Sequence, residues 1–543
     1  MLHLPVTVFT LFLMLLSFHS PSAGAASFSQ REEEQIERFQ RYLRIRTAHP
    51  NPDYAAAAAF LLAEARSIGL RDVSLEFAAG KPLVLLSWIG SDPSLPSLLL
   101  NSHMDSVPAE PSRWLHPPFA AVRDAEGRIF ARGAQDDKCI AVQYLEAIRN
   151  LKASGFAPLR SIHVSLVPDE EIGGDDGAAK FSASEQFREL NVGFMLDEGQ
   201  ASPKDEFRVF YADRSPLSLI VTAVGAPGHG SRMYDGGAME NLMDCVEAAA
   251  KFRASQFDQV KYGSKANSEV ISVNPVYMKA GTPSSTGFVM NMQPSEAEVG
   301  FDLRLPPTAD IDLLKKRIEE EWAPSIKNLT YKLIQKGPIR DNKGRPLATP
   351  TDESNPWWSA FKQAILASGG KLARPEILSS TTDARFMRQM GIPTLGFSPM
   401  KNTPILLHDH NEFLMDSVFL NGIKVYEQVI SALSSLPETS LHHNFQYLNS
   451  RFRKARMQCN AAAFHRGSLP SSEATFMHAT SSAFTSQRKG KSFRLKVGEE
   501  RKGTRAIAIS VLGLMAVTLI VLPRSGNKYG SPCCNTCSAE ESL

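Results

Sequence analysis

From residue 32 to residue 436 the chain alternates stretches of helical periodicity with short apolar runs. Apolar residues at helical spacing predict helices over 34–46, 53–68, 137–151 and 185–190. Short, nearly continuous apolar runs predict strands over 84–88, 98–101, 162–167 and 192–196. Such alternation is typical of an α/β fold, in which helices cover both faces of a mostly parallel sheet.

The pattern changes after residue 213. The next elements follow the ferredoxin-like order of strand, helix, two strands, helix and strand. They are predicted over 217–224, 238–252, 270–276, 298–304, 311–322 and 329–335. We therefore predict an inserted α+β domain over 214–336, which divides the first domain into 27–213 and 337–437. The first pattern resumes with a helix over 357–368, a strand over 394–397 and a long helix over 412–433.

Both ends of the chain differ from this body. An apolar run over 4–18, followed by small residues, predicts a secretory signal peptide over 1–26. Residues 438–505 are rich in Ser, His and basic residues without periodicity, which predicts a disordered basic linker. An uncharged apolar run over 506–523 is just long enough to span a membrane, and 524–543 form a tail.

These terminal signals conflict. A cleaved signal peptide would place the basic flank of the 506–523 run in the lumen, whereas the positive-inside rule would place it in the cytosol. We expect the secretory pathway, either the endoplasmic reticulum lumen or the exterior, with a candidate membrane contact through 506–523. A translated extension without function remains the alternative for this tail.

Composition adds little to this picture. A hydrophobic content of 43% and a charged content of 21% are ordinary for a globular protein, and a net charge of +2 gives no reason to expect nucleic acid. Only Cys139 and Cys245 lie in the main body, so we expect no disulfide framework.

Side chains that bind metals follow the ends of the predicted strands or open a helix. They are His103 and Asp105, Asp136, the pair Glu170 and Glu171, the pair Asp197 and Glu198, and His408. In open α/β sheets, ligands bind beyond the carboxyl ends of the strands, so we expect these segments to meet at one edge. Two imidazoles and three carboxylates suit zinc, and two ions could share one carboxylate.

Each of these residues also has a purely structural interpretation. His103 could be a hydrogen-bonded histidine at a strand end, and Asp136 could be only a helix N-cap. The pair at 197–198 could be turn residues, and His410 competes with His408. Agreement among the five segments favours the metal site.

The adjacent Glu170 and Glu171 suggest a division of labour. Neighbouring side chains on an extended segment point in opposite directions, so one carboxylate can hold a metal while the other faces a substrate. A metal hydrolase needs one carboxylate as ligand and one as general base.

Seven segments in order resemble the aminoacylase family, the N-acyl-L-amino-acid amidohydrolases among the dinuclear zinc peptidases. They are LNSHMDSVPAE, RIFARGAQDDKCIAVQYLEAIRNL, SLVPDEEIGGDDG, FMLDEG, RSPLSLIVTAVGAPGHGSR, TDESNPWW and LGFSPMKNTPILLHDHNE. The resemblance implies two zinc ions per subunit. The implied ligands are His103 and Glu198 at one ion, Glu171 and His408 at the other, and Asp136 between them.

The resemblance also implies roles for other residues. Asp105 would orient His103, and Glu170 would be the general base for a zinc-activated water. His229 would reach into the partner subunit's site and polarise the scissile carbonyl. Without the resemblance, the sequence favours a glycine-rich hairpin at His229. The residues implied to contact substrate are Asn291, Arg304 and Arg385.

Two ligand assignments have rivals. Peptidase relatives that use an aspartate make Asp197 the rival of Glu198. His408 is preferred to His410 because the family histidine precedes a glutamate by four positions, as His408 precedes Glu412.

The expected function is therefore zinc-dependent hydrolysis of N-acyl-L-amino acids to a carboxylate and a free L-amino acid. A dipeptidase or carboxypeptidase on the same scaffold is the alternative, and a non-catalytic zinc-binding protein is disfavoured because Glu170 is present. The resemblance further implies a homodimer in which the inserted domain serves as lid and dimerisation surface. Members of the aminoacylase family are typically cytoplasmic, and a cytoplasmic location is therefore the alternative to the secretory pathway.

Overall fold

The computed structural model describes residues 28–438. The predicted signal peptide over 1–26, the predicted linker over 438–505 apart from its first residue, the apolar run over 506–523 and the tail over 524–543 lie outside the described residues. Within residues 28–438, no helix is both long enough and apolar enough to cross a membrane.

An eight-stranded sheet forms the larger part of the fold, in the order β1-β2-β6-β3-β7-β18-β8-β17. Its centre, β6-β3-β7-β18, is parallel, as predicted. The pairs β1-β2, β2-β6 and β18-β8 are antiparallel, whereas β17 pairs with β8 in parallel. The strands are β1 (Arg71–Glu76), β2 (Pro82–Trp88), β3 (Ser97–His103), β6 (Ile162–Val167), β7 (Val192–Asp197), β8 (Phe210–Asp213), β17 (Glu376–Leu378) and β18 (Thr394–Gly396).

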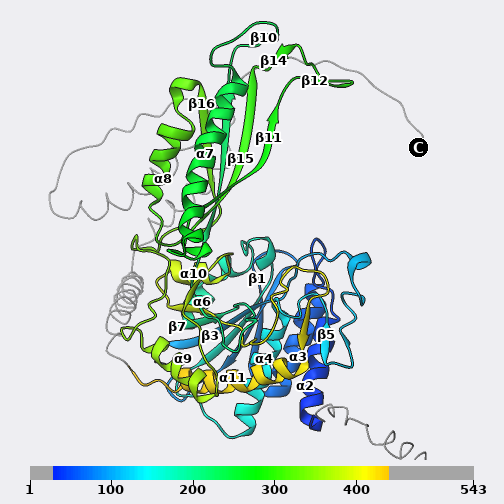
Figure 1. Cartoon of the computed structure of the whole chain (residues 1–543). Helices are drawn as coiled ribbons and strands as arrows, with labels where there is room; N and C mark the ends of the chain where they lie inside the picture. The colour runs from blue at the N-terminus through cyan, green and yellow to red at the C-terminus, as the bar shows by residue number, and fades with distance from the viewer. Residues whose placement is uncertain (1–27, 439–543) are drawn as a thin grey trace, which may run out of the picture. The chain divides into compact units, whose positions relative to one another are not determined.

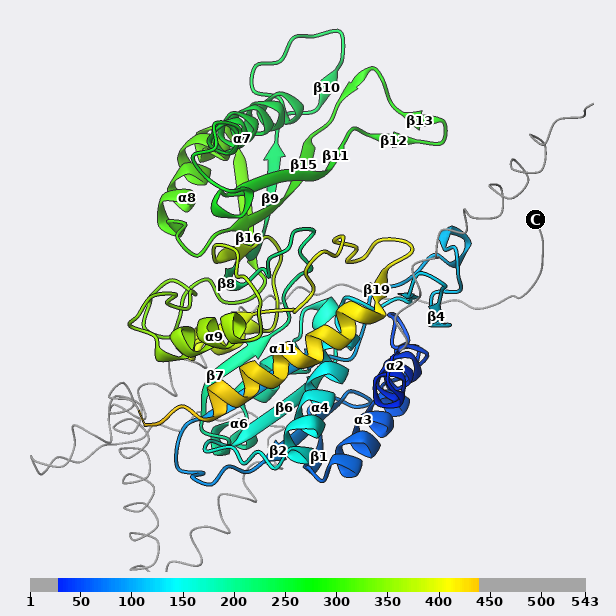
Figure 2. The ribbon, with the colours of Figure 1, turned by 60° about the horizontal axis from the view of Figure 1, so that its bottom comes forward.

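Helices cover both faces of this sheet because the central strands are apolar on both sides. Leu98 and Leu100 of β3 pack against one set of helices, and Leu99 packs against the other. The first set, which Figure 2 shows across the sheet, is α2 (Gln30–Leu43), α3 (Tyr54–Ile68), α4 (Lys138–Ala153), α9 (Pro356–Ala367) and α11 (Asp416–Ser434). The second is α5 (Ala178–Ala183), α6 (Glu185–Glu189) and α10 (Ala384–Gln389).

Local sequence sets the helix ends. The Asp53 carboxylate caps α3 by accepting the N–H of Ala56, and Gly69 ends the helix with φ 75°. The prediction of a helix starting at residue 412 is wrong at its N-terminus. Residues Phe413–Met415 form strand β19, which pairs with β5 (Arg128–Phe130), and β5 pairs with β4 (Val122–Arg123). Strand pairing therefore determines the conformation of residues 413–415, despite their helical periodicity.

A second, four-stranded antiparallel sheet has the order β11-β15-β9-β16. Helices α7 (Ala238–Lys261) and α8 (Ile311–Arg317) cover one face, around the buried Trp322 (Figure 1). The strands are β9 (Ser215–Val224), β11 (Ser272–Ala280), β15 (Glu296–Leu305) and β16 (Leu329–Gln335), with the short strands β10 (Gly228–His229), β12 (Pro283–Ser284), β13 (Gly287–Phe288) and β14 (Met292–Gln293) beside them. These elements follow the predicted order, and the role of this region as lid and dimerisation domain stays a prediction.

Candidate metal centre

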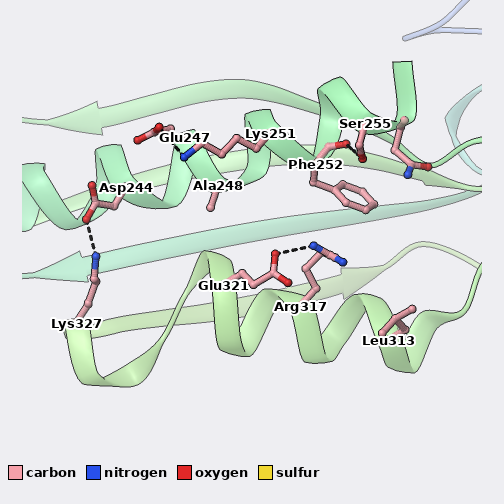
Figure 3. Close-up of a pocket in the computed structure, with 11 residues that line it drawn as sticks. Asp244, Glu247, Ala248, Lys251, Phe252, Ser255, Leu313, Arg317, Glu321 and Lys327 are labelled. Carbon is pink, nitrogen blue, oxygen red and sulfur yellow. Dashed lines mark hydrogen bonds and ion pairs between the residues drawn. The ribbon is translucent and has the colours of Figure 1, made fainter. Parts of the chain in front are cut away.

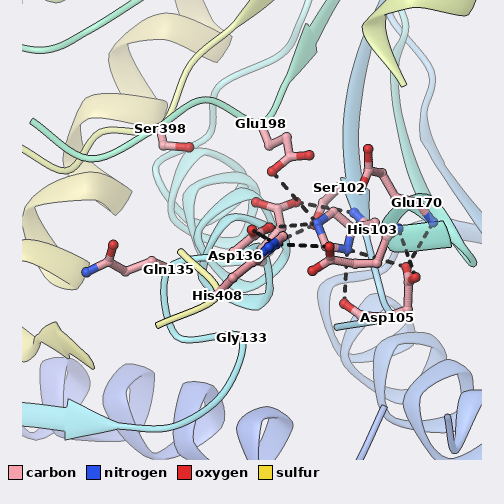
Figure 4. Close-up of polar contacts among 12 residues, drawn as sticks. Ser102, His103, Asp105, Gly133, Gln135, Asp136, Glu170, Glu198, Ser398 and His408 are labelled. Carbon is pink, nitrogen blue, oxygen red and sulfur yellow. Dashed lines mark hydrogen bonds and ion pairs between the residues drawn. The ribbon is translucent and has the colours of Figure 1, made fainter. Parts of the chain in front are cut away.

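The candidate metal-binding side chains meet at the carboxyl edge of the parallel strands. His103 is the last residue of β3, and Glu198 directly follows β7. Glu170 and Glu171 lie in a short 3-10 turn after β6. Because β6 and β7 both pair with β3 in parallel, these strand ends lie together. Asp136 comes from the segment before α4, and Figure 4 shows how it meets His103 and His408.

Five side chains form two triads that share Asp136. In the first triad, His103 Nε2 lies 3.0 Å from Asp136 Oδ1 and 3.7 Å from Glu198 Oε2. In the second triad, His408 Nε2 lies 3.3 Å from Asp136 Oδ2 and 3.1 Å from Glu171 Oε2. Within each triad, one ligand atom from each residue lies within 4.8 Å of the others. The two oxygens of one carboxylate thus face two separate groups of ligands.

The chemistry of the triads fits divalent cations. Glu171 Oε1 is buried and has no hydrogen-bond partner in the described part of the chain. Burial raises the pKa of Glu198 well above its usual range, and the nearby Asp136 carboxylate adds to the rise. Burial and Asp136 likewise raise the pKa of Glu171. Carboxylates crowded in this way need positive charge between them, and oxygen and imidazole nitrogen ligands suit zinc.

The nearby carboxylates also raise the pKa values of both imidazoles. Hydrogen bonds to Asp136 and Glu171 raise the pKa of His408 to about 10. Burial alone would lower the pKa of His103, but Glu198, Asp105 and Asp136 raise it well above its usual value. A cation that binds to these ring nitrogens therefore has to compete with protons.

The rival ligands have other positions. Asp197 Oδ1 accepts a hydrogen bond from Asn101 Nδ2 at 2.9 Å, and Asp197 Oδ2 accepts one from the N–H of Ala384 at 2.7 Å. His410 belongs to neither triad. The N-cap position of α4 is occupied by Asp137, so the interpretation of Asp136 as an N-cap is wrong. The geometry therefore places Glu198 and His408 in the triads rather than their rivals.

Asp105 connects His103 to the turn that carries the two glutamates. Its carboxylate accepts the N–H groups of Glu170 and Glu171, both at 3.1 Å. His103 Nδ1 lies 3.0 Å from the Asp105 carbonyl oxygen and 3.4 Å from Oδ1. Burial opposes ionisation of Asp105, but hydrogen bonds with His103 and His49 lower its pKa to about 2.

His49 is a site residue that the sequence did not reveal. Its Nε2 lies 2.8 Å from Asp105 Oδ2, whereas His103 Nδ1 lies near Oδ1, so the two histidines contact different oxygens of this carboxylate. It follows α2 in a segment that contains no strand, and the rule that ligands follow strands therefore could not find it.

Glu170 lies in the same turn but in neither triad. Burial raises the pKa of Glu170 well above its usual range, and the carboxylates of Asp383 and Glu171 contribute to the rise. Arg385 is held nearby, because its Nη2 donates to the Gly173 carbonyl oxygen at 2.5 Å. The carboxylate of Glu170 thus stands outside both triads and has a raised affinity for a proton.

The other three predicted residues do not join the triads in the described chain. His229 is exposed, and its Nδ1 lies 2.7 Å from Ser231 Oγ. Asn291 is its neighbour, because the Asn291 carbonyl oxygen accepts the N–H of Gly230 at 2.7 Å. Arg304 lies on β15 and pairs with Asp302 at 2.8 Å.

A separate groove between α7 and α8 does not resemble a catalytic site (Figure 3). Its charged side chains neutralise one another: Lys327 with Asp244 at 2.6 Å, Arg317 with Glu321 at 2.6 Å and Lys251 with Glu247 at 2.7 Å. The groove therefore leaves little unpaired charge with which to recognise a polar ligand.

Comparison with known proteins agrees with the geometry. The model of peptidase family M20/M25/M40 matches residues 99–432. Aminoacylase-1 of Homo sapiens is 41% identical over 409 residues, which are 75% of this chain and 97% of that protein. Aminoacylase-1 of Dictyostelium discoideum is 42% identical over 415 residues, with 75% and 99% covered. The crystal structure of aminopeptidase PepT from Bacillus cereus matches in fold, with a TM-score of 0.58 at 15% identity, over 74% of this chain and 99% of that one.

Proposed function

The chain belongs to peptidase family M20/M25/M40, and from this premise we propose that it hydrolyses N-acyl-L-amino acids to a carboxylate and a free L-amino acid. It is a hydrolase that acts on amides. The observation that carries the proposal is the pair of triads sharing Asp136, with Glu170 beside them. The extended similarity to Aminoacylase-1 supports this substrate class over dipeptides.

The residues divide the work of the reaction between them. His103, Asp136 and Glu198 would hold one divalent cation, and Asp136, Glu171 and His408 a second, both proposed to be zinc. Zinc bound there would supply Lewis acidity that polarises the acyl carbonyl and lowers the pKa of water. Glu170 takes the proton of the attacking water and passes it to the nitrogen of the leaving amine. Asp105 keeps His103 and the Glu170 turn in place.

The activity of the protein should depend on both the metal and the acyl substrate. We expect the purified protein to hydrolyse N-acetyl-L-methionine, to lose this activity in strong chelator and to regain it when zinc is added. The free amino acid released is measured with an amine-reactive dye. Faster cleavage of a dipeptide than of N-acetyl-L-methionine would favour the dipeptidase alternative. Full activity in chelator would rule out the metal mechanism.

We propose further that two copies of the chain form a homodimer through the inserted domain. β11 is an edge strand of the second sheet, and its Val276, Tyr277 and Met278 are 61%, 42% and 52% exposed. The neighbouring Phe288 and Met290 are 59% and 92% exposed. Within the described chain β11 pairs only with β15, and an apolar edge strand of this kind is a surface that a second copy could cover.

The dimer gives His229 a testable role. His229→Ala and Glu170→Gln should each be nearly inactive, since each removes one part of every site. If His229 acts across the interface, a heterodimer of the two variants contains one complete site. Mixing and reassociating them should therefore restore activity to about a quarter of the wild-type value. The heterodimer fraction is measured with two affinity tags, and a mixture that stays inactive while it forms heterodimers would contradict the proposal.

A further inference from the structure

Two segments that carry ligands of the second triad lie side by side. One, residues 131–136, ends at Asp136, and the other, residues 404–413, contains His408. They are joined where the N–H of Ala131 donates to the Glu412 carbonyl oxygen at 3.1 Å, next to the β5–β19 pairing. Two side chains, Glu412 and Gln135, add most of the remaining links between these segments.

The Glu412 carboxylate is fully buried and accepts hydrogen bonds from the segment that ends at Asp136. Its Oε1 accepts the N–H groups of Gln135 at 2.7 Å and Asp136 at 3.3 Å. Its Oε2 accepts the N–H of Gly133 at 3.0 Å and a hydrogen bond from Arg132 Nη1 at 2.9 Å. Gly133 has a φ of 84°, a conformation that lets successive N–H groups point toward one anion.

Gln135 makes the reciprocal connection. Its Nε2 donates to the carbonyl oxygens of Pro404 at 3.1 Å and Phe413 at 2.8 Å, and its Oε1 accepts the N–H of Leu406 at 3.1 Å. Figure 4 shows that its side chain points away from the triads. Gln135 therefore fixes both ends of the segment that contains His408 without approaching a ligand atom.

His408 needs such support. It has a φ of 63°, which non-glycine residues seldom adopt, and its side chain is 55% exposed. It also lies in a segment without helix or strand. Its carbonyl oxygen accepts a hydrogen bond from Arg132 Nη2 at 3.3 Å. Arg132 is also the arginine that pairs with Glu412.

We propose that Glu412 and Gln135 are positioning residues that hold Asp136 and His408 at the separation required for a metal ion in the second triad. The inference rests on the proposed metal site and adds two residues to it that touch neither metal nor substrate. Because Glu412 fixes the shared Asp136, its loss affects both triads. Loss of Gln135 releases only the His408 side and should weaken the second triad.

The experiment measures the zinc affinity of the purified full-length protein and of its variants by competition with a fluorescent chelator. Residues that support metal ligands typically contribute 10- to 100-fold to metal affinity. In Glu412→Gln the new amide turns an NH₂ group toward N–H donors, and we expect the affinity to fall by about 10- to 100-fold. In Gln135→Ala we expect a loss of about tenfold in one of the two binding steps.

Glu146→Gln is the matched control. Glu146 is equally buried and pairs with Arg38 at 2.8 Å and Arg149 at 3.1 Å, but it belongs to neither segment. Its variant should lose stability and keep its zinc affinity. Equal losses in Glu146→Gln and Glu412→Gln, or unchanged affinity in Gln135→Ala, would overturn the inference.

Three further outcomes can be told apart. If Glu412→Gln does not fold, Gln135→Ala decides the question alone, because it removes no charge and leaves the Arg132–Glu412 pair intact. If the wild-type protein binds no zinc, the proposed function fails together with the inference. If the wild type binds zinc and the variants bind it equally well, only the inference fails.

Discussion

Replacing Glu170 with glutamine should lower kcat by about a thousandfold or more while the zinc content stays unchanged. An amide of the same size cannot accept the proton of the attacking water, and general acid–base catalysis typically contributes between about 10² and 10⁴ in rate. Glu170 lies in neither triad, so its neutralisation removes no ligand. KM should change little, because the substrate contacts remain. The measurement is kcat and KM on N-acetyl-L-methionine, with zinc determined by mass spectrometry on the same sample.

The neighbouring residue provides the control for this result. Glu171→Gln changes the same functional group one position away, but Glu171 Oε2 faces His408 Nε2 at 3.1 Å in the second triad. This variant should lose zinc as well as activity. If Glu170→Gln lost zinc to the same extent, or kept its kcat, the assignment of Glu170 as the base would be wrong.

The parallel part of the site could be predicted from the sequence because it follows from a local rule. Apolar runs locate β3, β6 and β7, and parallel pairing brings their carboxyl ends to one edge. His103, Glu171 and Glu198 therefore needed only strand positions to be placed together. Their separations, and the sharing of Asp136 between two triads, depend on packing that no single segment encodes.

Other features lie beyond that rule. His49 reaches Asp105 from a segment without a strand. Residues Phe413–Met415 look like the first turn of α11, but pairing with β5 makes them a strand and leaves the buried Glu412 outside the helix. β1 carries mostly exposed residues, so its antiparallel pairing with β2 left no strong apolar signal. The role proposed for His229 came only from the family resemblance, because periodicity within one chain cannot describe a contact with a second chain.

Replacing Asp136 with asparagine should have the largest effect on metal binding, because Asp136 is the ligand that both triads share. Asp136 Oδ1 faces His103 and Asp136 Oδ2 faces His408, and an amide retains only one oxygen acceptor. We expect the variant to lose at least one equivalent of zinc and activity to fall below detection. Zinc stoichiometry and activity are measured together on the same sample.

The reason for this expectation is electrostatic as well as geometric. Hydrogen bonds from His103 and His408 hold the pKa of Asp136 far below its usual range, although burial alone would raise it. Ionisation of Asp136 is thus favoured while the pKa values of the surrounding acids are raised, and in the proposed metal centre both cations would share its negative charge. Its neutral replacement weakens both positions at once, whereas Glu198→Gln or His408→Ala each removes a ligand from one triad only. If Asp136→Asn retained both zinc ions with unchanged affinity, the shared carboxylate would not be a ligand and the two triads could not be metal sites of the kind proposed.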